Sequence, residues 1–421
     1  MVINLIERKK KVLKKLKEGV VFLWGRPSFL SIGGSEKFYQ ERKFLYLTDF
    51  NEPDSALLIK PASKKPYIFF CLPKNEEEEK WTGERLGPEK ALELLPVDEA
   101  YPINLWQEKL YESLIGEKVF YYQWGVFPEL DFKVLQVLQR LKKEQRADKI
   151  PSKIIDSGLI INFFRLIKEK EEIERIKKAI EITKIALDEV FKNLNYIRWE
   201  YEVEAILKSN YIKNGSDGES FPSIVAAGKN GTYLHYNKNN SKIKKGDLLI
   251  VDTGCLWKGY ASDVTRTFIV YGKASEEQKQ IYKAVLDVQE EIIKLSKPNI
   301  SLCQLNQICQ KKIAEKLIEL KILKKSIQEV MEKNLHKKYF PHRMGHWLGL
   351  DVHDADSLGM EDLKVKLKPG MVFTIEPGIY IPEEEKSPYR GIGVRLEEDI
   401  LIKKDGAEVL TKEIPKFISL G

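Results

Sequence analysis

Four carboxylates and one imidazole in the second half of the chain occupy short motifs that could present ligands to metal ions: Asp252, Asp263, His346, Glu376 and Glu397. Asp252 closes an apolar run at 248–251 that predicts a buried strand. Gly254 and Gly259 lie near the two ends of the segment that leads to Asp263, which is typical of a hairpin. We therefore expect the two aspartates to lie side by side.

The second carboxylate pair repeats this plan. Gly246 precedes Asp252 by the same five-residue spacing with which Gly370 precedes Glu376. Upstream, the segments 171–180 and 276–285 share Glu-Glu, an isoleucine, Lys-Ala and a final branched residue. These matches predict a diverged internal duplication in which each half runs from helices into a hairpin. The copies are too long to be stacked solenoid units, so a pseudo-symmetric sheet is the better expectation.

Charge favours a metal site with two ions. Four carboxylates contribute four negative charges, which two divalent cations would neutralise; without cations the carboxylates would repel one another and some would protonate. Oxygen-rich ligation with one imidazole suits manganese, while cobalt, iron and zinc are also possible. The alternative is that the four are unrelated surface acids among the 63 acidic residues. The repeated spacing argues against it.

Four of the five histidines fall in two motifs, His235 in one and His342, His346 and His353 in the other. The second motif is too rich in glycine for a plain helix, so its histidines are expected around one cleft. His336 lies outside both motifs and is expected on the surface.

The expected chemistry is hydrolysis, because paired cations activate water and polarise a carbonyl group. His342 and His353 could serve the oxyanion and the leaving amine, in either assignment. No Gly-x-Ser-x-Gly motif occurs, and Cys255 is expected to be buried as a small apolar residue. A serine or cysteine nucleophile is therefore not predicted.

The strings VDTG, SDVTRT, GHWLGLDVHD, TIEPGIY and GVRLEED resemble the pita-bread metallopeptidases, which include methionine aminopeptidase, prolidase and aminopeptidase P. The resemblance implies that Asp252 and Asp263 bind one metal, that His346 and Glu376 bind the second, and that Asp263 and Glu397 bridge them. It also implies the following further roles: general base for Glu376, substrate contact for His235, His342 and His353, and support of the site for Arg395 and Tyr380.

The amino-terminal half distinguishes the subgroups. Residues 44–54 and 81–87 are similar to aminopeptidase P, whereas methionine aminopeptidases lack this domain. The resemblance implies cleavage before a proline at the second position of a peptide, with prolidase, an Xaa-Pro dipeptidase, as the alternative. Asp49 and Arg343 stand where aminopeptidase P usually has glycine, so backbone strain is expected there if those glycines have positive φ.

Trp81 matches a tryptophan that, in aminopeptidase P, helps to cover the active site of a neighbouring subunit. The resemblance therefore implies substrate contact by Trp81 and a homo-oligomer. The alternative is that Trp81 packs inside its own domain. A non-catalytic binding module, as in relatives that have lost metal ligands, is a further alternative, but all five ligand positions are filled here.

Composition fits two domains, an α/β domain at 1–165 and an α+β pita-bread catalytic domain at 166–421. Amphipathic spacing predicts a helix at about 171–191, a docked helix over the basic segment 8–17, and a solvated helix face at 76–79.

Several observations favour a cytoplasmic protein. The four cysteines form no disulfide pattern, no signal segment is recognisable, and no apolar run reaches about 20 residues. A net charge of +7 on a chain of 421 residues is a weak excess and does not predict nucleic-acid binding.

Overall fold

The computed structural model describes residues 3–28, 38–355 and 364–416. The chain divides into two compact units, Val2–Arg165 and Leu166–Gly421, the second of which also takes in Met1. None of the helices in the described ranges combines the length and the apolar character needed to cross a bilayer.

The amino-terminal unit is built on a six-stranded sheet in the order β4-β3-β2-β1-β5-β6. Its strands are β1 (Val20–Trp24), β2 (Ala56–Ile59), β3 (Tyr67–Cys71), β4 (Glu99–Pro102), β5 (Val119–Tyr121) and β6 (Lys153–Ile155). The pairs β1/β2 and β2/β3 are antiparallel, and the other three pairs are parallel. The three central strands are wholly buried, which explains their continuous apolar runs.

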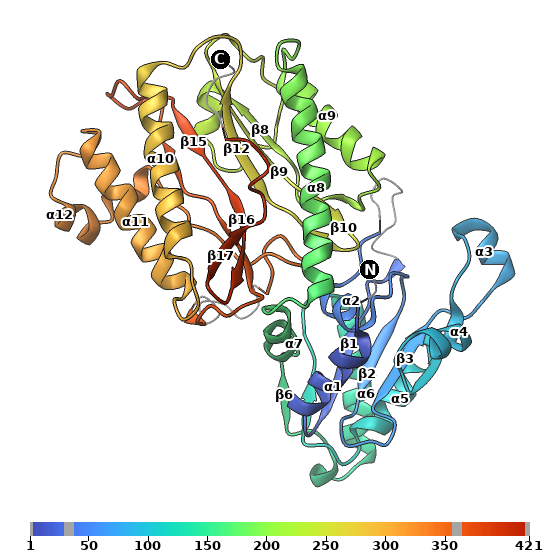
Figure 1. Cartoon of the computed structure of the whole chain (residues 1–421). Helices are drawn as coiled ribbons and strands as arrows, with labels where there is room; N and C mark the ends of the chain where they lie inside the picture. The colour runs from blue at the N-terminus through green and yellow to red at the C-terminus, as the bar shows by residue number, and fades with distance from the viewer. Residues whose placement is uncertain (1–2, 29–37, 356–363, 417–421) are drawn as a thin grey trace. The chain divides into compact units, whose positions relative to one another are not determined.

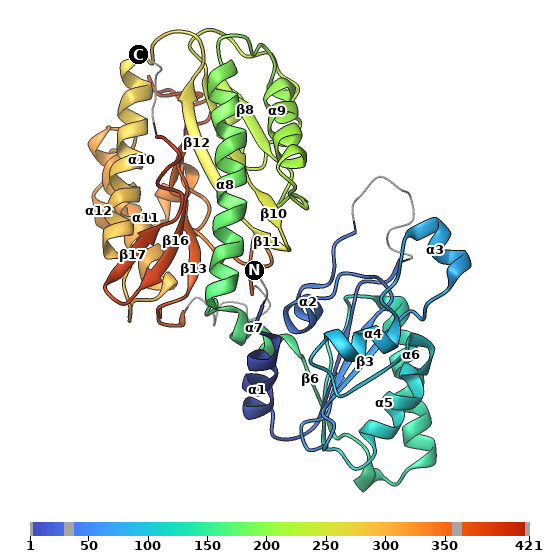
Figure 2. The ribbon, with the colours of Figure 1, turned by 45° about the vertical axis from the view of Figure 1, so that its right-hand side comes forward.

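Helices cover both faces of this sheet (Figure 2). The covering helices are α1 (Leu5–Lys15), α2 (Arg42–Thr48), α4 (Gly87–Leu94), α5 (Trp106–Leu114), α6 (Pro128–Glu144) and α7 (Gly158–Arg165). Helix α3 (Glu76–Thr82) belongs to the same unit but buries none of its residues. Leu110 of α5 and Val134 of α6 share one core with Phe120 of the sheet. On the opposite face, Phe44 of α2 stacks on Phe69 at a centroid distance of 6.0 Å. The predicted α/β domain is confirmed.

Two helix predictions for this unit are confirmed, one of them with a change. Residues 76–78 of α3 are exposed and Glu79 is half-buried, which agrees with the predicted solvated face. The basic segment forms α1 and docks through Val12, but Arg8 is also buried, because its guanidinium donates to the carbonyl oxygen of Tyr46 at 2.6 Å.

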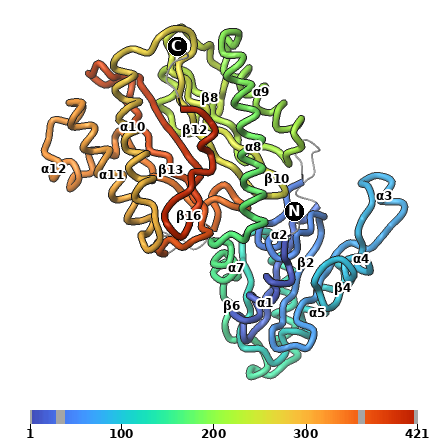
Figure 3. The backbone as a smooth tube through the Cα atoms, viewed as in Figure 1, coloured from blue at the N-terminus to red at the C-terminus, as the bar shows by residue number. Residues whose placement is uncertain are grey.

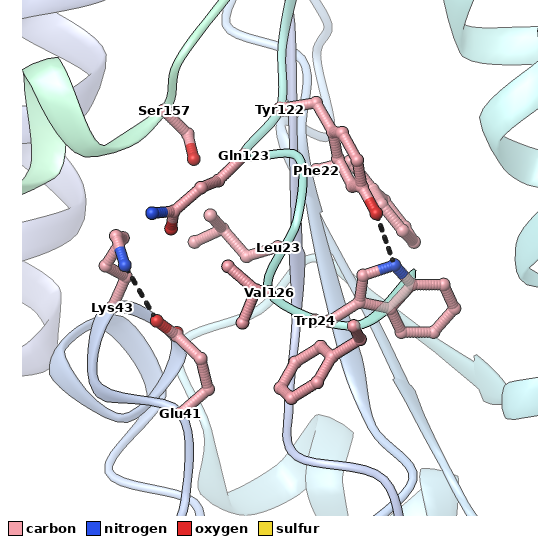
Figure 4. A pocket seen from close by; sticks show the side chains of 10 residues that line it. Phe22, Leu23, Trp24, Glu41, Lys43, Tyr122, Gln123, Val126 and Ser157 are labelled. Carbon is pink, nitrogen blue, oxygen red and sulfur yellow. Dashed lines mark hydrogen bonds and ion pairs between the residues drawn. The ribbon is translucent and has the colours of Figure 1, made fainter. Parts of the chain in front are cut away.

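A small cavity lies at the carboxyl ends of β1 and β5, where open α/β sheets often bind ligands (Figure 4). Lys43 and Glu41 form an ion pair of 2.9 Å on its wall, and Trp24 Nε1 donates to Tyr122 Oη at 3.2 Å. Its volume of about 20 Å³ has room for one or two water molecules and not for a metabolite.

The carboxy-terminal unit has two halves, each of which runs from helices into strands (Figure 1). The first half contains α8 (Lys170–Asn193), α9 (Glu200–Lys213), β7 (Gly218–Glu219), β8 (Ile224–Ala227), β9 (Leu248–Thr253), β10 (Cys255–Trp257), β11 (Tyr260–Ala261) and β12 (Val264–Ile269). The second contains α10 (Glu276–Leu295), α11 (Leu302–Glu319), α12 (Ile327–Glu332), β13 (Val372–Ile375), β14 (Gly378–Tyr380), β15 (Gly393–Arg395), β16 (Glu398–Lys403) and β17 (Gly406–Val409). Two helices in the first half and three in the second precede an antiparallel strand pair, β9 with β12 and β13 with β16, in agreement with the predicted duplication.

The long helices α8 and α10 lie alongside the strands in both views of the ribbon. Each begins with a capping box, Glu169 with Glu172 in α8 and Ser275 with Gln278 in α10. Helix α8 matches the helix predicted at about 171–191. Figure 3 shows the chain passing through α10, α11 and α12 before it returns to the sheets at β13.

Three local expectations have a structural outcome. The surface position predicted for His336 is wrong: its side chain is fully buried in the turn after α12, with Nε2 3.4 Å from Gln310 Oε1. Asp49 keeps a positive φ of 50°, a conformation that aspartate tolerates better than most residues, whereas Arg343 does not have positive φ. Trp81 is 90% exposed, so the alternative that it packs inside its own domain is wrong.

Candidate metal centre and active site

The first carboxylate pair comes from the hairpin of β9 and β12. These strands are antiparallel, with Asp252 paired to Thr265 and Thr253 paired to Val264. Asp263 immediately precedes β12, so the predicted approach of the two aspartates is confirmed. The connection is not a plain loop: it forms a small hairpin of its own from β10 and β11.

The second pair is placed in the same way by β13 and β16. Glu376 directly follows β13 and Glu397 directly precedes β16, and the strands pair through Ile375 and Glu398. The backbone N–H of Glu397 donates to the carbonyl oxygen of Thr265 at 3.1 Å. This bond joins the two halves at the point where their carboxylates meet.

His346 completes the cluster. Its Nε2 lies 3.4 Å from Asp263 Oδ2 and 3.5 Å from Glu376 Oε1. Ligand atoms of Asp263, His346 and Glu397 all lie within 4.8 Å of one another. The other ring nitrogen, Nδ1, is 3.0 Å from the carbonyl oxygen of Trp347. A proton on Nδ1 leaves the Nε2 lone pair directed at the carboxylates, which is the usual arrangement of a metal-binding histidine.

The electrostatics of the cluster fit divalent cations. Burial, followed by the charges of Asp252, Asp399 and Glu376, raises the pKa of Asp263 well above its usual range. Burial also raises the pKa values of Glu376 and Glu397. The Oδ1 atoms of Asp252 and Asp263 are buried and accept no hydrogen bond from the residues that the structure describes. Nearby positive charge would satisfy these oxygens and keep the carboxylates ionised.

A chain of hydrogen bonds links Asp252 to His342 through Arg395 and Tyr380, both of which are predicted to support the site. Arg395 donates to Asp252 Oδ2 at 2.7 Å and to Tyr380 Oη at 3.1 Å. Tyr380 Oη lies 2.9 Å from Nε2 of His342, whose Nδ1 lies 2.7 Å from the carbonyl oxygen of Arg343. With the ring proton on Nδ1, the tyrosine donates to Nε2. Burial, with the charge of Arg395, lowers the pKa of His342 to about 3, so its imidazole is neutral at neutral pH.

Two adjoining cavities of about 270 Å³ each open onto the cluster. They share five lining residues: His235, Asp252, His346, His353 and Glu376. One extends toward His342, Arg343 and Arg395, and the other toward an apolar wall with Phe221, Pro222, Ile224 and Val352. Burial, with the charge of His346, lowers the pKa of His353 to about 4. The structure thus gathers every predicted site residue of this unit, Tyr380 through its contacts with His342 and Arg395; Trp81 belongs to the amino-terminal unit.

Close backbone contacts explain two glycines in the motifs. A Cβ on Gly254 would lie 1.9 Å from the carbonyl oxygen of Ser262, and one on Gly345 would lie 1.9 Å from that of Thr374. Only glycine lets the chain pass the strands at this distance.

Sequence reasoning missed two threonines that orient the cluster. Thr265 Oγ1 donates to Glu397 Oε2 at 2.8 Å, and Thr374 Oγ1 accepts from the backbone N–H of His346 at 3.1 Å. Their spacing carried a signal, because Thr374 lies two residues before Glu376 and alternate residues of a strand face the same side.

Two family models match the chain. Metallopeptidase family M24 matches residues 174–404, and the aminopeptidase P N-terminal domain matches residues 5–121. The chain is 35% identical to Xaa-Pro aminopeptidase of Escherichia coli strain K12, over 97% of this chain and 94% of that protein. It is 33% identical to Xaa-Pro aminopeptidase 3 of Homo sapiens, over 98% of this chain and 82% of that protein.

Solved structures agree. The low-pH form of aminopeptidase P from E. coli aligns with a TM-score of 0.92 at 34% identity, over 99% of this chain and 97% of that one. A zinc-substituted form of the E. coli enzyme in complex with product aligns with a TM-score of 0.90 at 33% identity, over 98% of this chain and 95% of that one. The predicted pita-bread fold is confirmed. The chain belongs to metallopeptidase family M24 and carries the amino-terminal domain of aminopeptidase P.

Proposed function

We propose that this protein is a metal-dependent aminopeptidase that hydrolyses the bond between the first residue of a peptide and a following proline. The strongest support is the cluster of four carboxylates and one imidazole on the wall of a cavity large enough for a short peptide. The similarity to Xaa-Pro aminopeptidases over nearly the whole chain favours this specificity over that of prolidase.

We assign two divalent ions, in the first instance Mn²⁺, to the cluster. Asp252 and Asp263 would hold one ion, His346 and Glu376 the other, and Asp263 and Glu397 would bridge them. Four carboxylates balance two divalent charges, and an oxygen-rich set with one imidazole suits manganese; cobalt, iron and zinc remain alternatives. Bound ions would supply an activated water and a polarised carbonyl group.

Glu376 is assigned as the general base. It lines both cavities, so its carboxylate can lie within hydrogen-bond reach of a water molecule beside the substrate, and burial raises the pKa of the carboxyl group. Its Oε2 lies 3.8 Å from His342 Nδ1. In this assignment the carboxyl group takes the proton from water and passes it to the leaving amine.

The histidines are given different tasks. His342 has both ring nitrogens engaged by Arg343 and Tyr380, so it orients Tyr380 and shapes the substrate side of the site. His353 and His235 line both cavities and are assigned to contact the peptide, with His353 as the donor to the oxyanion. Arg395 is assigned to orient Asp252 through its hydrogen bond to Oδ2, and Tyr380, which accepts from Arg395, to link this pair to His342.

The prolyl nitrogen carries no hydrogen, so a peptidase that relies on that N–H as a donor loses the interaction, whereas a site shaped for the ring gains selectivity. Prolidase must in addition bind the free carboxylate directly after proline. Aminopeptidase P leaves that side open to a continuing chain.

Two further assignments concern the whole protein. We assign Trp81 to the edge of a neighbouring subunit's site in a homo-oligomer, since it is exposed and matches the aminopeptidase P tryptophan. We also assign the protein to the cytoplasm: its four cysteines are all free, as expected in a reducing compartment.

Product analysis tests the proposal. The protein is incubated with an Xaa-Pro-Xaa-Xaa peptide as purified, after chelation, and after chelation followed by Mn²⁺, and the products are identified by mass spectrometry. We expect the free first residue and the shortened peptide, with loss after chelation and recovery with metal. Cleavage at another bond, or full activity in chelator, would contradict the proposal.

A further inference from the structure

We infer that Glu200 is a positioning residue that holds the segment carrying His235 against the substrate cavity. The inference rests on the proposed function, because His235 is assigned there as a substrate contact. Residues 227–241 are called the His235 segment below.

Glu200 is the first residue of α9 and is fully buried. Its carboxylate accepts four hydrogen bonds, all from the His235 segment. Oε1 accepts from the backbone N–H of Ala227 at 2.8 Å and from Asn230 Nδ2 at 2.9 Å. Oε2 accepts from Tyr236 Oη at 2.8 Å and from the backbone N–H of Ser241 at 2.7 Å. Such a set of donors compensates the cost of burying the charge.

The four donors bracket His235. Ala227 and Asn230 lie before it in the chain, and Tyr236 and Ser241 lie after it. The backbone N–H of Glu200 also donates to the carbonyl oxygen of Ser241 at 3.0 Å, so this end of the segment is held twice. One carboxylate therefore fixes both ends of the stretch that carries the histidine.

His235 has little else to fix it. It lines both cavities and is exposed, and in the described part of the chain no hydrogen bond reaches its ring. Its place on the cavity wall therefore depends on the backbone of the segment. Displacing a substrate-positioning group by about 1 Å can cost on the order of 100-fold in rate.

The substitution Glu200→Gln keeps the shape of the side chain but replaces one acceptor oxygen by an NH₂ group. Each oxygen faces one backbone N–H, of Ala227 or of Ser241. In either orientation of the amide, one of these N–H groups would therefore face another donor. Glu172→Gln is the matched control: Glu172 is also buried on a helix, but its carboxylate accepts from Tyr260 Oη at 2.8 Å and from the backbone N–H of Glu169 at 2.8 Å, both outside the His235 segment.

The first arm is a double-mutant cycle on kcat/KM for an Xaa-Pro-Xaa-Xaa peptide. We expect Glu200→Gln to lower kcat/KM by about 10-fold or more in the wild-type background and by less than about 2-fold in the His235→Ala background. Glu172→Gln should change kcat/KM by less than about 2-fold. If Glu200→Gln lowered kcat/KM by the same factor in both backgrounds, or left kcat/KM unchanged in both, the inference would be overturned.

The second arm does not depend on activity. Hydrogen exchange measured by mass spectrometry should show faster exchange at 227–241 in Glu200→Gln, with exchange in α8 and β9 unchanged; in Glu172→Gln the same segment should be unchanged. Wild-type protein that cleaves no Xaa-Pro peptide would refute the proposed function, while this arm would still decide whether Glu200 holds the segment. Unchanged exchange at 227–241 in Glu200→Gln would overturn the inference.

Discussion

At the scale of single residues, Asp263 is a buried carboxylate whose pKa is raised by burial and by neighbouring acids, and one of its oxygens accepts no hydrogen bond within the described ranges. We predict that Asp263→Asn leaves less than about a tenth of wild-type kcat/KM, a loss above about 1.4 kcal/mol, even in excess metal, because an amide cannot supply the bridging charge. Asp287→Asn, at an aspartate of α10 that pairs with Lys283 and Lys316, is the control. Retention of more than that tenth would argue against the ligand assignment.

Tyr380 acts on the site through its neighbours, since its hydroxyl lies between Arg395 and His342. We predict that Tyr380→Phe lowers kcat by about 10-fold or more while bound metal, measured by atomic emission, stays at the wild-type level. The phenyl ring preserves packing, and only the hydrogen bonds are lost. Wild-type kcat in this variant would show that the chain of hydrogen bonds has no part in the reaction.

At the scale of elements, the turn η5 (Leu335–Lys338) buries His336, and burial lowers the pKa of this histidine below its usual 6.5. The unfolded chain therefore takes up a proton at higher pH than the folded chain. This contribution to stability is fully present above about pH 6.5 and is lost as the pH falls toward the lower folded value.

We predict that the urea midpoint falls less between about pH 7 and about pH 5 in His336→Gln than in the wild type. The carboxylate cluster also titrates on acidification, but it does so in both proteins, so their difference isolates His336. An equal fall of the urea midpoint in the two proteins would contradict the burial of a neutral imidazole at this position.

Elements were predictable where a local pattern dictates them. The run at 248–251 is followed by a carboxylate, and the same glycine spacing at 370–376 predicts a second hairpin; the structure contains both. The small hairpin of β10 and β11 was not predicted, because its strands have only three and two residues and show no periodicity. His336 is predicted on the surface because it lies outside both histidine motifs, whereas tertiary packing buries its ring.

The candidate site, too, could be predicted only where a local sequence pattern marks the residue. The clustering of the four carboxylates and His346 could be predicted from motifs, but the parts played by the two threonines and Glu200 could not, because these rest on hydrogen bonds to residues distant in the chain. Glu200 reads in the sequence as an ordinary acidic residue in the first turn of a helix.

At the scale of the whole molecule, the exposure of Trp81 at 90% is unusual for a large aromatic side chain. We predict that light scattering at micromolar concentration shows a homo-oligomer, and that Trp81→Ala raises KM for an Xaa-Pro-Xaa-Xaa peptide by about threefold or more. Leu94→Ala, at a residue of the same unit that is 68% exposed, serves as the control. A fully active monomer would contradict the assignment of Trp81 to a neighbouring subunit's site.

The most direct measurement compares kcat/KM for three matched substrates with Mn²⁺ present: Xaa-Pro-Xaa-Xaa, Xaa-Ala-Xaa-Xaa and the dipeptide Xaa-Pro. Cleavage before proline in a continuing chain predicts the highest value for Xaa-Pro-Xaa-Xaa, about 10-fold or more above Xaa-Ala-Xaa-Xaa, and slower cleavage of the dipeptide. A clear preference for the dipeptide would make the protein a prolidase, and equal values for proline and alanine would contradict proline specificity altogether.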